Sequence, residues 1–256
     1  MQNNIIYEQP LNERVRTFLR LEHLFYIVNH HITYSDQWDN RATITSLLNI
    51  VDLLSRSDIK TELIKELERH SSTLNALTTN PNVDHERLHN ILNNIIKILE
   101  SLRDSSYQPG QIMRQDEFIT SIRQRSIIPG GSCNFDLPGY HYWLHKPPEE
   151  RIKDIKKWHS DLLLIHDALK LTLHMIRNSA TPVKEQAMAG FYQKPIESNL
   201  ACQLIRVVLP SQTKYFPEIS GGKHRFTVRF MEQDSTTSRP IQTQDNVEFE
   251  LHCCIL

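Results

Sequence analysis

Glycine is scarce in this chain of 256 residues: it occurs only seven times, and never among the first hundred positions. Because glycine supplies many of the turns of β-rich folds, its scarcity favours long helices over a glycine-punctuated β architecture. Long apolar runs are missing too, since the longest aliphatic stretch is Leu162–Ile165. A membrane-spanning helix needs roughly 18 to 20 consecutive apolar residues, so the sequence predicts no such helix.

The chain also lacks paired cysteine motifs and an overall charge. Its four cysteines, Cys133, Cys202, Cys253 and Cys254, contain no C-x-x-C spacing, and we expect reduced thiols. Lys and Arg number 29 against 30 Asp and Glu, which indicates neither wholesale disorder nor a generally basic nucleic-acid binder. The first ten residues lack the features of a secretory signal, so we expect a cytoplasmic protein whose charge acts locally.

The apolar pattern changes its period near Thr181-Pro182. Before this point it predicts helices over about 12–30, around Ile44–Leu54, from Ile59, after an N-cap at Asp84, over 116–125 and over about 148–178. After it, alternation predicts strands over 200–209, 223–231 and 247–253. The predicted fold is α+β: a helical bundle domain at 1–180, whose residues 3–9 are a candidate strand joining the sheet, followed by a smaller antiparallel β domain at 181–256.

One segment matches a metal-site pattern. The run His85-Glu86-Arg87-Leu88-His89 fits H-E-x-x-H, which places two imidazoles on one helical face to bind zinc, with Glu86 as general base. The extended motif, however, has glycine and histidine where this chain has Leu92 and Ile95. Candidate third ligands are Asp104, Asp116 and Glu117. We prefer a solvated helix start without metal and keep a zinc-dependent hydrolase as the alternative.

Motifs for nucleotides and nucleophiles are incomplete. Gly222-Lys223 is followed by His224 rather than serine or threonine, so it is not a phosphate-binding loop. The run Gly130–Cys133 lacks the G-x-S-x-G arrangement of a nucleophile elbow, and we expect a structural turn there. No cofactor is predicted.

Basic residues gather locally between Leu200 and Met231. This segment holds Arg206, Lys214, Lys223, Arg225 and Arg229 against a single acid, Glu218. Arg225 and Arg229 share one strand face, about 13 Å apart at the usual rise, and suit separate points on an extended acidic peptide. Alternatively, Glu248 and Glu250 neutralise both arginines across the sheet, and the pattern leaves the two interpretations open. Nucleic acid is disfavoured, because this face offers no aromatic residues among its cations for stacking.

The segment Arg123–His145, with the sequence RQRSIIPGGSCNFDLPGYHYWLH, closely resembles the signature of the ZapD family, bacterial cell-division proteins associated with FtsZ. Further similar segments follow in the same order: Thr61–Leu67, Gly190–Gln193, Tyr215–Gly221, Arg225–Met231 and Phe249–Cys254. The resemblance spans nearly the whole chain.

The resemblance implies a non-enzymatic homodimer that binds the C-terminal tail of FtsZ and cross-links its filaments into bundles at the division septum, without nucleic acid or membrane partners. The tail-binding residues of the family correspond to Arg56, Arg225 and Arg229. Arg20 and His141 correspond to a candidate assembly surface. The sequence departs from its relatives near Asp116-Glu117, where a basic residue is expected.

Overall fold

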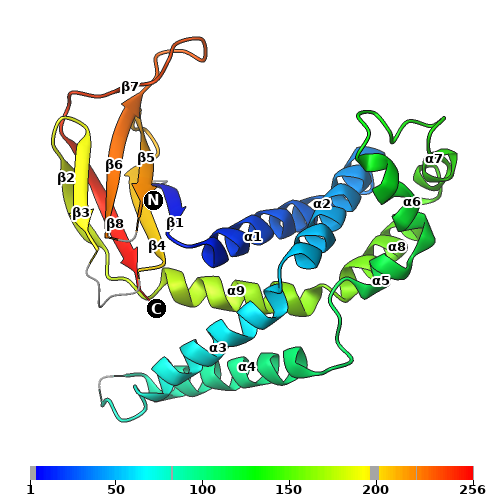
Figure 1. Ribbon diagram of the computed structural model, residues 1–256, viewed down its shortest axis with the longest axis horizontal. Coiled ribbons are helices and arrows are strands. Elements are labelled where there is room, and N and C mark those ends of the chain that lie inside the picture. The colour runs from blue at the N-terminus through cyan, green and yellow to red at the C-terminus, as the bar shows by residue number, and fades with distance from the viewer. Residues whose placement is uncertain (1–3, 82, 197–201, 223, 256) are drawn as a thin grey trace. The chain divides into compact units, whose positions relative to one another are not determined.

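The computed structural model describes residues 4–81, 83–196, 202–222 and 224–255 (Figure 1). Its elements confirm the predicted α+β class, with helices in the N-terminal part and antiparallel strands in the C-terminal part. The chain divides into two compact units. We call Met1–Phe18 with Leu173–Leu256 the β unit, and Leu19–Thr172 the helical unit.

Helices account for most of the chain before Arg177. They are α1 (Glu13–His31), α2 (Gln37–Arg56), α3 (Ile59–Asn75), α4 (His85–Arg103), α5 (Gln111–Gln115), α6 (Glu117–Ser126), α7 (Pro138–Leu144), α8 (Pro148–Ser160) and α9 (Leu163–Arg177). None of the helices in the described ranges is long and apolar enough to cross a membrane.

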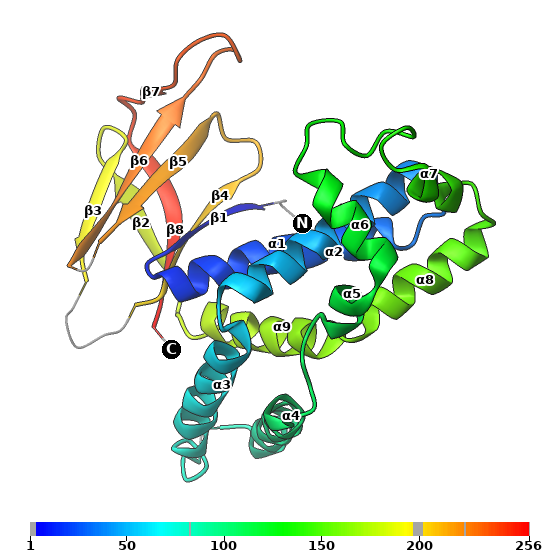
Figure 2. The same ribbon diagram turned by 45° about the vertical axis from the view of Figure 1, so that its right-hand side comes forward.

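Aspartate side chains begin several of these helices. The carboxylates of Asp36, Asp58 and Asp84 accept hydrogen bonds from backbone N–H groups of the first turn, at 2.8, 3.2 and 3.0 Å. Each bond satisfies a donor that has no partner within the helix itself. The predicted N-cap at Asp84 is therefore confirmed. The helix that it begins, α4, packs side by side with α3 (Figure 2).

The single helix predicted over about 148–178 is wrong. The chain forms α8 and α9, with a turn at Asp161 and Leu162 between them. The Tyr107 hydroxyl donates to the Asp161 carbonyl at 2.8 Å, and the Asp161 carboxylate accepts from the backbone N–H of Ile112 at 2.9 Å. These bonds supply partners for polar groups at the interruption. The apolar period hides the break, because Trp158 and Ile165 are buried on either side of the turn and Leu162 is buried within it.

The β unit contains two antiparallel sheets (Figure 1). In sheet A the strand order is β1 (Asn4–Pro10), β4 (Leu204–Pro210), β8 (Val247–Cys254), β2 (Val183–Ala187). In sheet B it is β3 (Phe191–Pro195), β6 (Arg225–Glu232), β5 (Tyr215–Gly221), and β7 (Ile241–Gln242) also pairs with β6. Residue 3 of the expected N-terminal strand, residues 200 and 201 of the expected strand 200–209, and Lys223 lie outside the described residues.

Side chains from both sheets share one apolar cluster. It contains Ala187, Ile205, Val207, Leu209, Phe226, Val228, Phe230, Val247, Phe249 and Leu251, all at most 4% exposed. The alternation predicted for β6 is confirmed, since Phe226, Val228 and Phe230 are buried whereas Arg225 and Arg229 are exposed. The outward direction of these arginines is thus fixed by burial of their neighbours.

A carboxylate on β1 ties the N-terminal strand to later parts of the β unit. Glu8 accepts two bonds from Arg177, both at 2.8 Å, and one from the Nε of Arg206 at 2.9 Å. The three side chains are between 15 and 23% exposed. Because these groups have limited access to water, removing the shared carboxylate leaves two guanidinium groups without a counter-charge, which costs more than the loss of a surface ion pair.

Replacing Glu8 by glutamine should destabilise the β unit, because two partly buried guanidinium groups lose their shared negative charge. We expect the free energy of unfolding to fall by about 2–3 kcal/mol, measured by denaturant titration. The control is Glu232→Gln, whose partner Lys214 lies 3.4 Å away and is 62% exposed. An equal effect of both substitutions would contradict a special contribution of the Glu8 cluster.

Candidate functional site

The outer surface of sheet B carries two exposed cations on its middle strand. We define the basic face as Arg225, Thr227 and Arg229 of β6 with their outward neighbours on β3 and β5, namely Phe191, Gln193, Pro195, Glu218 and Ser220. No hydrogen bond or ion pair joins the guanidinium of Arg225 or Arg229 to any part of the chain that the structure describes. Both groups are therefore available to a ligand from outside.

Apolar side chains lie beside these arginines. Phe191 pairs with Arg229 and is 39% exposed, and Pro195 pairs with Arg225. Glu218 stands opposite Arg229 on β5, but no ion pair between the two is present among the described residues. The basic face thus combines separated positive charges with exposed apolar area, which suits a peptide containing both carboxylates and apolar side chains.

Neutralisation of Arg225 and Arg229 by Glu248 and Glu250 is wrong. Both glutamates lie on β8, which belongs to sheet A, whereas the arginines lie on sheet B. Glu250 instead contacts His252, with 2.7 Å between Oε1 and Nε2. The opposite sheets separate these charges, so the cross-strand rule does not apply to them.

The remaining cations of the predicted basic segment do not join this face. Arg206 is held by Glu8 in sheet A. Lys214 forms ion pairs with Glu232 and Asp245 at 3.4 and 3.2 Å, and the hydrogen bond to Asp245 raises the pKa of Lys214 above its ordinary value. Only part of the positive charge counted along the sequence is therefore free to attract an acidic partner.

Arg56 and Arg20 line one groove within the helical unit, between α1 and α2. This α1–α2 groove has a volume of about 360 Å³ and is lined by Arg20, His23, Leu24, Asn49, Asp52, Leu53 and Arg56. Asp52 is paired with Arg123 at 2.6 Å. Arg20 and Arg56 are exposed, and neither side chain has a hydrogen bond or ion pair among the described residues. Leucine side chains between two cations give the groove the same mixed chemistry as the basic face.

His141 lies on α7, and large apolar side chains are exposed on α7 and in the loop before it. We define the α7 surface as His141 and Tyr142 together with Ile127, Ile128 and Phe135 of the preceding loop. Ile127, Phe135 and Tyr142 are 83, 80 and 70% exposed. Exposed apolar side chains of this size are candidates for contact with another protein chain. His141 itself has its ring 4.4 Å from that of His145.

Asp116, the position where a basic residue was expected in relatives, supports the fold. Its carboxylate accepts from the backbone N–H of Ile119 at 3.1 Å, which caps α6. It also accepts from the indole N–H of Trp158 at 2.9 Å. Trp158 stacks on Phe118 and lies near Trp143, so Asp116 orients an aromatic layer beneath the α7 surface.

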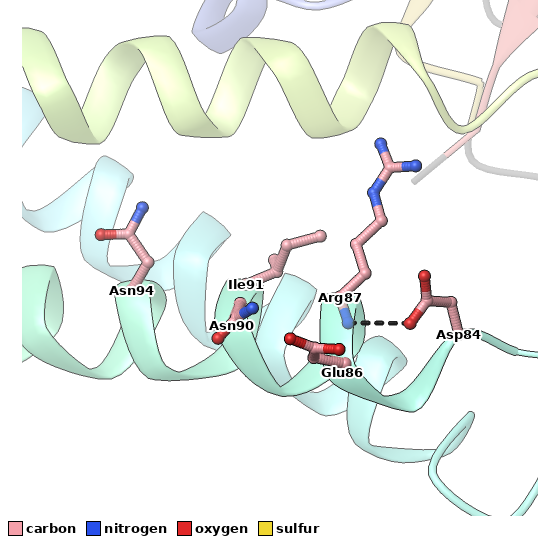
Figure 3. A pocket seen from close by; sticks show the side chains of 6 residues that line it. All are labelled: Asp84, Glu86, Arg87, Asn90, Ile91 and Asn94. Atoms are coloured by element: carbon pink, nitrogen blue, oxygen red, sulfur yellow. Dashed lines mark hydrogen bonds between the residues drawn. The ribbon is translucent and has the colours of Figure 1, made fainter.

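The H-E-x-x-H segment forms no metal site among the described residues. His85 and His89 are both exposed at the start of α4, and no group of three His, Cys, Asp or Glu side chains in these ranges is placed to hold a metal ion. The nearby hollow is lined by the N-cap Asp84 and by residues of α4, as Figure 3 shows for Glu86, Arg87 and Asn90. The zinc hydrolase interpretation has no support in the structure.

The fold and these surfaces define a class: an α+β protein that displays open, charged and apolar surfaces suited to other macromolecules. The sequence profile of the ZapD family, described as cell division protein, matches residues 19–229. Cell division protein ZapD of Methylococcus capsulatus is 41% identical over 256 residues, covering 100% of both chains. The proteins of the same name from Cupriavidus pinatubonensis and Coxiella burnetii are 39 and 35% identical over 251 residues, covering 98% of this chain and 99 and 97% of theirs.

This chain belongs to the ZapD family of cell division proteins. Membership supports a role in cell division and points to a non-catalytic protein.

Several residues of these surfaces had no signal in the sequence analysis. Phe191 and Pro195 were missed because no strand was predicted there. Gly190, between Val183–Ala187 and Phe191–Pro195, was an available signal, because glycine favours the turn of a tight hairpin; the positive φ of Ala189, 47°, had no such signal in its residue type. His23, Leu24 and Leu53 gave no such signal, because only helix packing brings them to one groove.

Removing the cations of the basic face should leave the fold intact. Arg225→Ala and Arg229→Ala should each change the free energy of unfolding by no more than about 0.5 kcal/mol, because both side chains are exposed. The matched control on the same strand is Phe230→Ala, which empties a fully buried position and should cost about 3–5 kcal/mol. Denaturant titration measures all three, and a large loss for either arginine variant would show that the side chain is structural.

Proposed function

We propose that this protein binds the C-terminal tail of FtsZ and cross-links FtsZ filaments into bundles that support Z-ring assembly at the septum. The observation that carries the proposal is the pair of exposed guanidinium groups, Arg225 and Arg229, which have no partner among the described residues. A guanidinium group can donate two parallel hydrogen bonds to a carboxylate of the tail. The exposed ring of Phe191 offers a contact for an apolar side chain of the tail.

Arg56 supplies a second contact point in this proposal. It lies in the α1–α2 groove, where Leu24 and Leu53 provide apolar surface for a tail side chain. A tail that orders on binding loses conformational entropy, so each contact is expected to be weak. Many tails along a filament compensate through avidity, and the same interaction recruits the protein from the cytoplasm to the septum.

Cross-linking requires at least two tail-binding sites, and we infer that a homodimer provides them. A twofold dimer duplicates every site without a further gene product. The α7 surface is the best-supported contact between the two copies, because Ile127, Phe135 and Tyr142 expose large apolar side chains around His141. Arg20, the other residue of the candidate assembly surface, lies in the α1–α2 groove with Arg56, and we keep it as a second candidate contact between copies.

Co-sedimentation with polymerised FtsZ tests tail binding. The protein should pellet with intact filaments and remain in the supernatant with filaments lacking the C-terminal tail. Arg225→Glu with Arg229→Glu should lower affinity at least tenfold, because charge-assisted hydrogen bonds contribute about 1.5–3 kcal/mol each. Lys184→Glu, on sheet A, is the charge-matched control for each single variant, Arg225→Glu or Arg229→Glu, measured alongside the double variant. Equal pelleting with tailless FtsZ, or by the double variant, would reject the proposed site.

The α7 surface is tested by the oligomeric state. Phe135→Glu should convert a dimer to a monomer in light scattering coupled to size-exclusion chromatography, because the charge would be buried in the contact. The same variant should still bind the isolated tail but should no longer bundle filaments. Tyr26→Glu, at a position 76% exposed on α1, is the matched control. A Phe135→Glu variant that remains dimeric would place the dimer contact elsewhere.

A further inference from the structure

Cys253 lines a cavity in the β unit that the proposed function does not use. The cavity has a volume of about 310 Å³, and its walls include Val183, Lys194, Leu251 and Ile255. Cys253 lies on β8 and packs against the apolar cluster between the sheets, where it is only partly buried. A small polar reagent in this cavity would therefore meet the Cys253 sulfur.

A second thiol stands beside Cys253. Cys202 precedes β4 and packs against the same apolar cluster. Its position is held by antiparallel pairing of β4 with β8 and by the Gln203 N–H, which donates to the Cys254 carbonyl at 2.8 Å. The Cys202 thiol donates to the Leu204 carbonyl at 3.8 Å and also interacts with the Cys253 thiol. The fold thus brings together two thiols that lie far apart in the sequence.

Charged side chains surround this pair on β2 and β3. The Nζ of Lys194 lies 3.2 Å from Oε1 of Glu185. The hydrogen bond from Cys202, together with the positive charge of Lys194, lowers the pKa of Cys253, whereas burial and Glu185 act in the opposite direction. The bond to Cys253 and burial raise the pKa of Cys202, so Cys202 stays protonated while Cys253 ionises.

The other two cysteines differ from this pair. Cys254 points away from the cavity, its thiol donates to the Arg177 carbonyl at 3.8 Å, and burial raises its pKa to about 12. Cys133 is exposed in the loop before α7, in the helical unit. Because nucleophilic attack requires the thiolate, Cys254 is expected to react slowly with an oxidant. Cys133 serves as the comparison for a thiol that is simply exposed to solvent.

We propose that Cys253 and Cys202 form an oxidation-sensitive dithiol site whose reagent is hydrogen peroxide. The Cys253 thiolate attacks one peroxide oxygen, the O–O bond breaks, and sulfenic acid forms on Cys253 as hydroxide leaves. The Cys202 sulfur then attacks the Cys253 sulfur, the S–O bond breaks, and the hydroxyl leaves as water with the proton of Cys202. Two thiols are oxidised to one disulfide, and one peroxide is reduced to two waters.

Hydrogen peroxide is the probe, added to the full chain, with free thiols counted after unfolding and linked peptides identified by mass spectrometry. The wild type should lose two of its four thiols and yield one peptide pair joining Cys202 to Cys253. Cys133→Ser should lose two thiols at the same rate. Cys253→Ser should not form this linkage, and Cys202→Ser should stop at a sulfenic acid on Cys253 that dimedone traps.

Two charge variants distinguish a change in the reactivity of Cys253 from a change in its exposure caused by loosening of the fold. Lys194→Met should slow consumption of the Cys253 thiol severalfold at neutral pH, and Glu185→Gln should accelerate it. A general loosening of the fold would change both rates in the same direction, which would overturn the proposal. Faster oxidation of Cys133 or Cys254 than of Cys253, or a linkage that does not join Cys202 to Cys253, would overturn it as well.

Discussion

Burial of the inner face of β6 determines which side chains of the β unit meet the solvent. Phe226, Val228 and Phe230 fill the space between the sheets, so their neighbours in the strand must face outward. A shift of one residue in register would bury Arg225 and Arg229 and expose the aromatic rings. The large free-energy cost of such a register shift keeps the basic face in one arrangement. Substitutions of its outward-facing residues therefore have little effect on the stability of the fold.

Local sequence patterns predicted the parts of this structure that depend on neighbouring residues. The period of two in β6, the cap at Asp84 and the change from helices to strands all arise within a few positions of the chain. The basic segment illustrates the limit of such patterns. Arg206 looks equivalent to Arg225 in sequence, but pairing of β1 with β4 brings Glu8 to it from the far end of the chain. The cavity beside Cys253 depends likewise on residues from several strands.

The helical unit shows the same distinction between pattern and packing. The break at Asp161 was invisible because a two-residue turn preserves the apolar period, while its hydrogen-bond partners come from around Tyr107 and Ile112. Arg20 and Arg56 are far apart in sequence and meet only because α1 and α2 pack together. Trp143 of α7 is buried against Trp158 of α8, which anchors α7 within the helical unit. Surfaces built in this way are preformed, which reduces the entropy lost when a partner binds.

The β unit is discontinuous in the chain, and this has a consequence for biosynthesis. β1 leaves the ribosome first, yet its partner β4 follows about two hundred residues later. At about 5–20 residues per second, the strand waits on the order of 10 to 40 seconds before it can pair. During this interval the helical segments can already fold, while the edge of β1 remains open to other nascent chains. Translation speed therefore sets how long β1 stays without its partner strand.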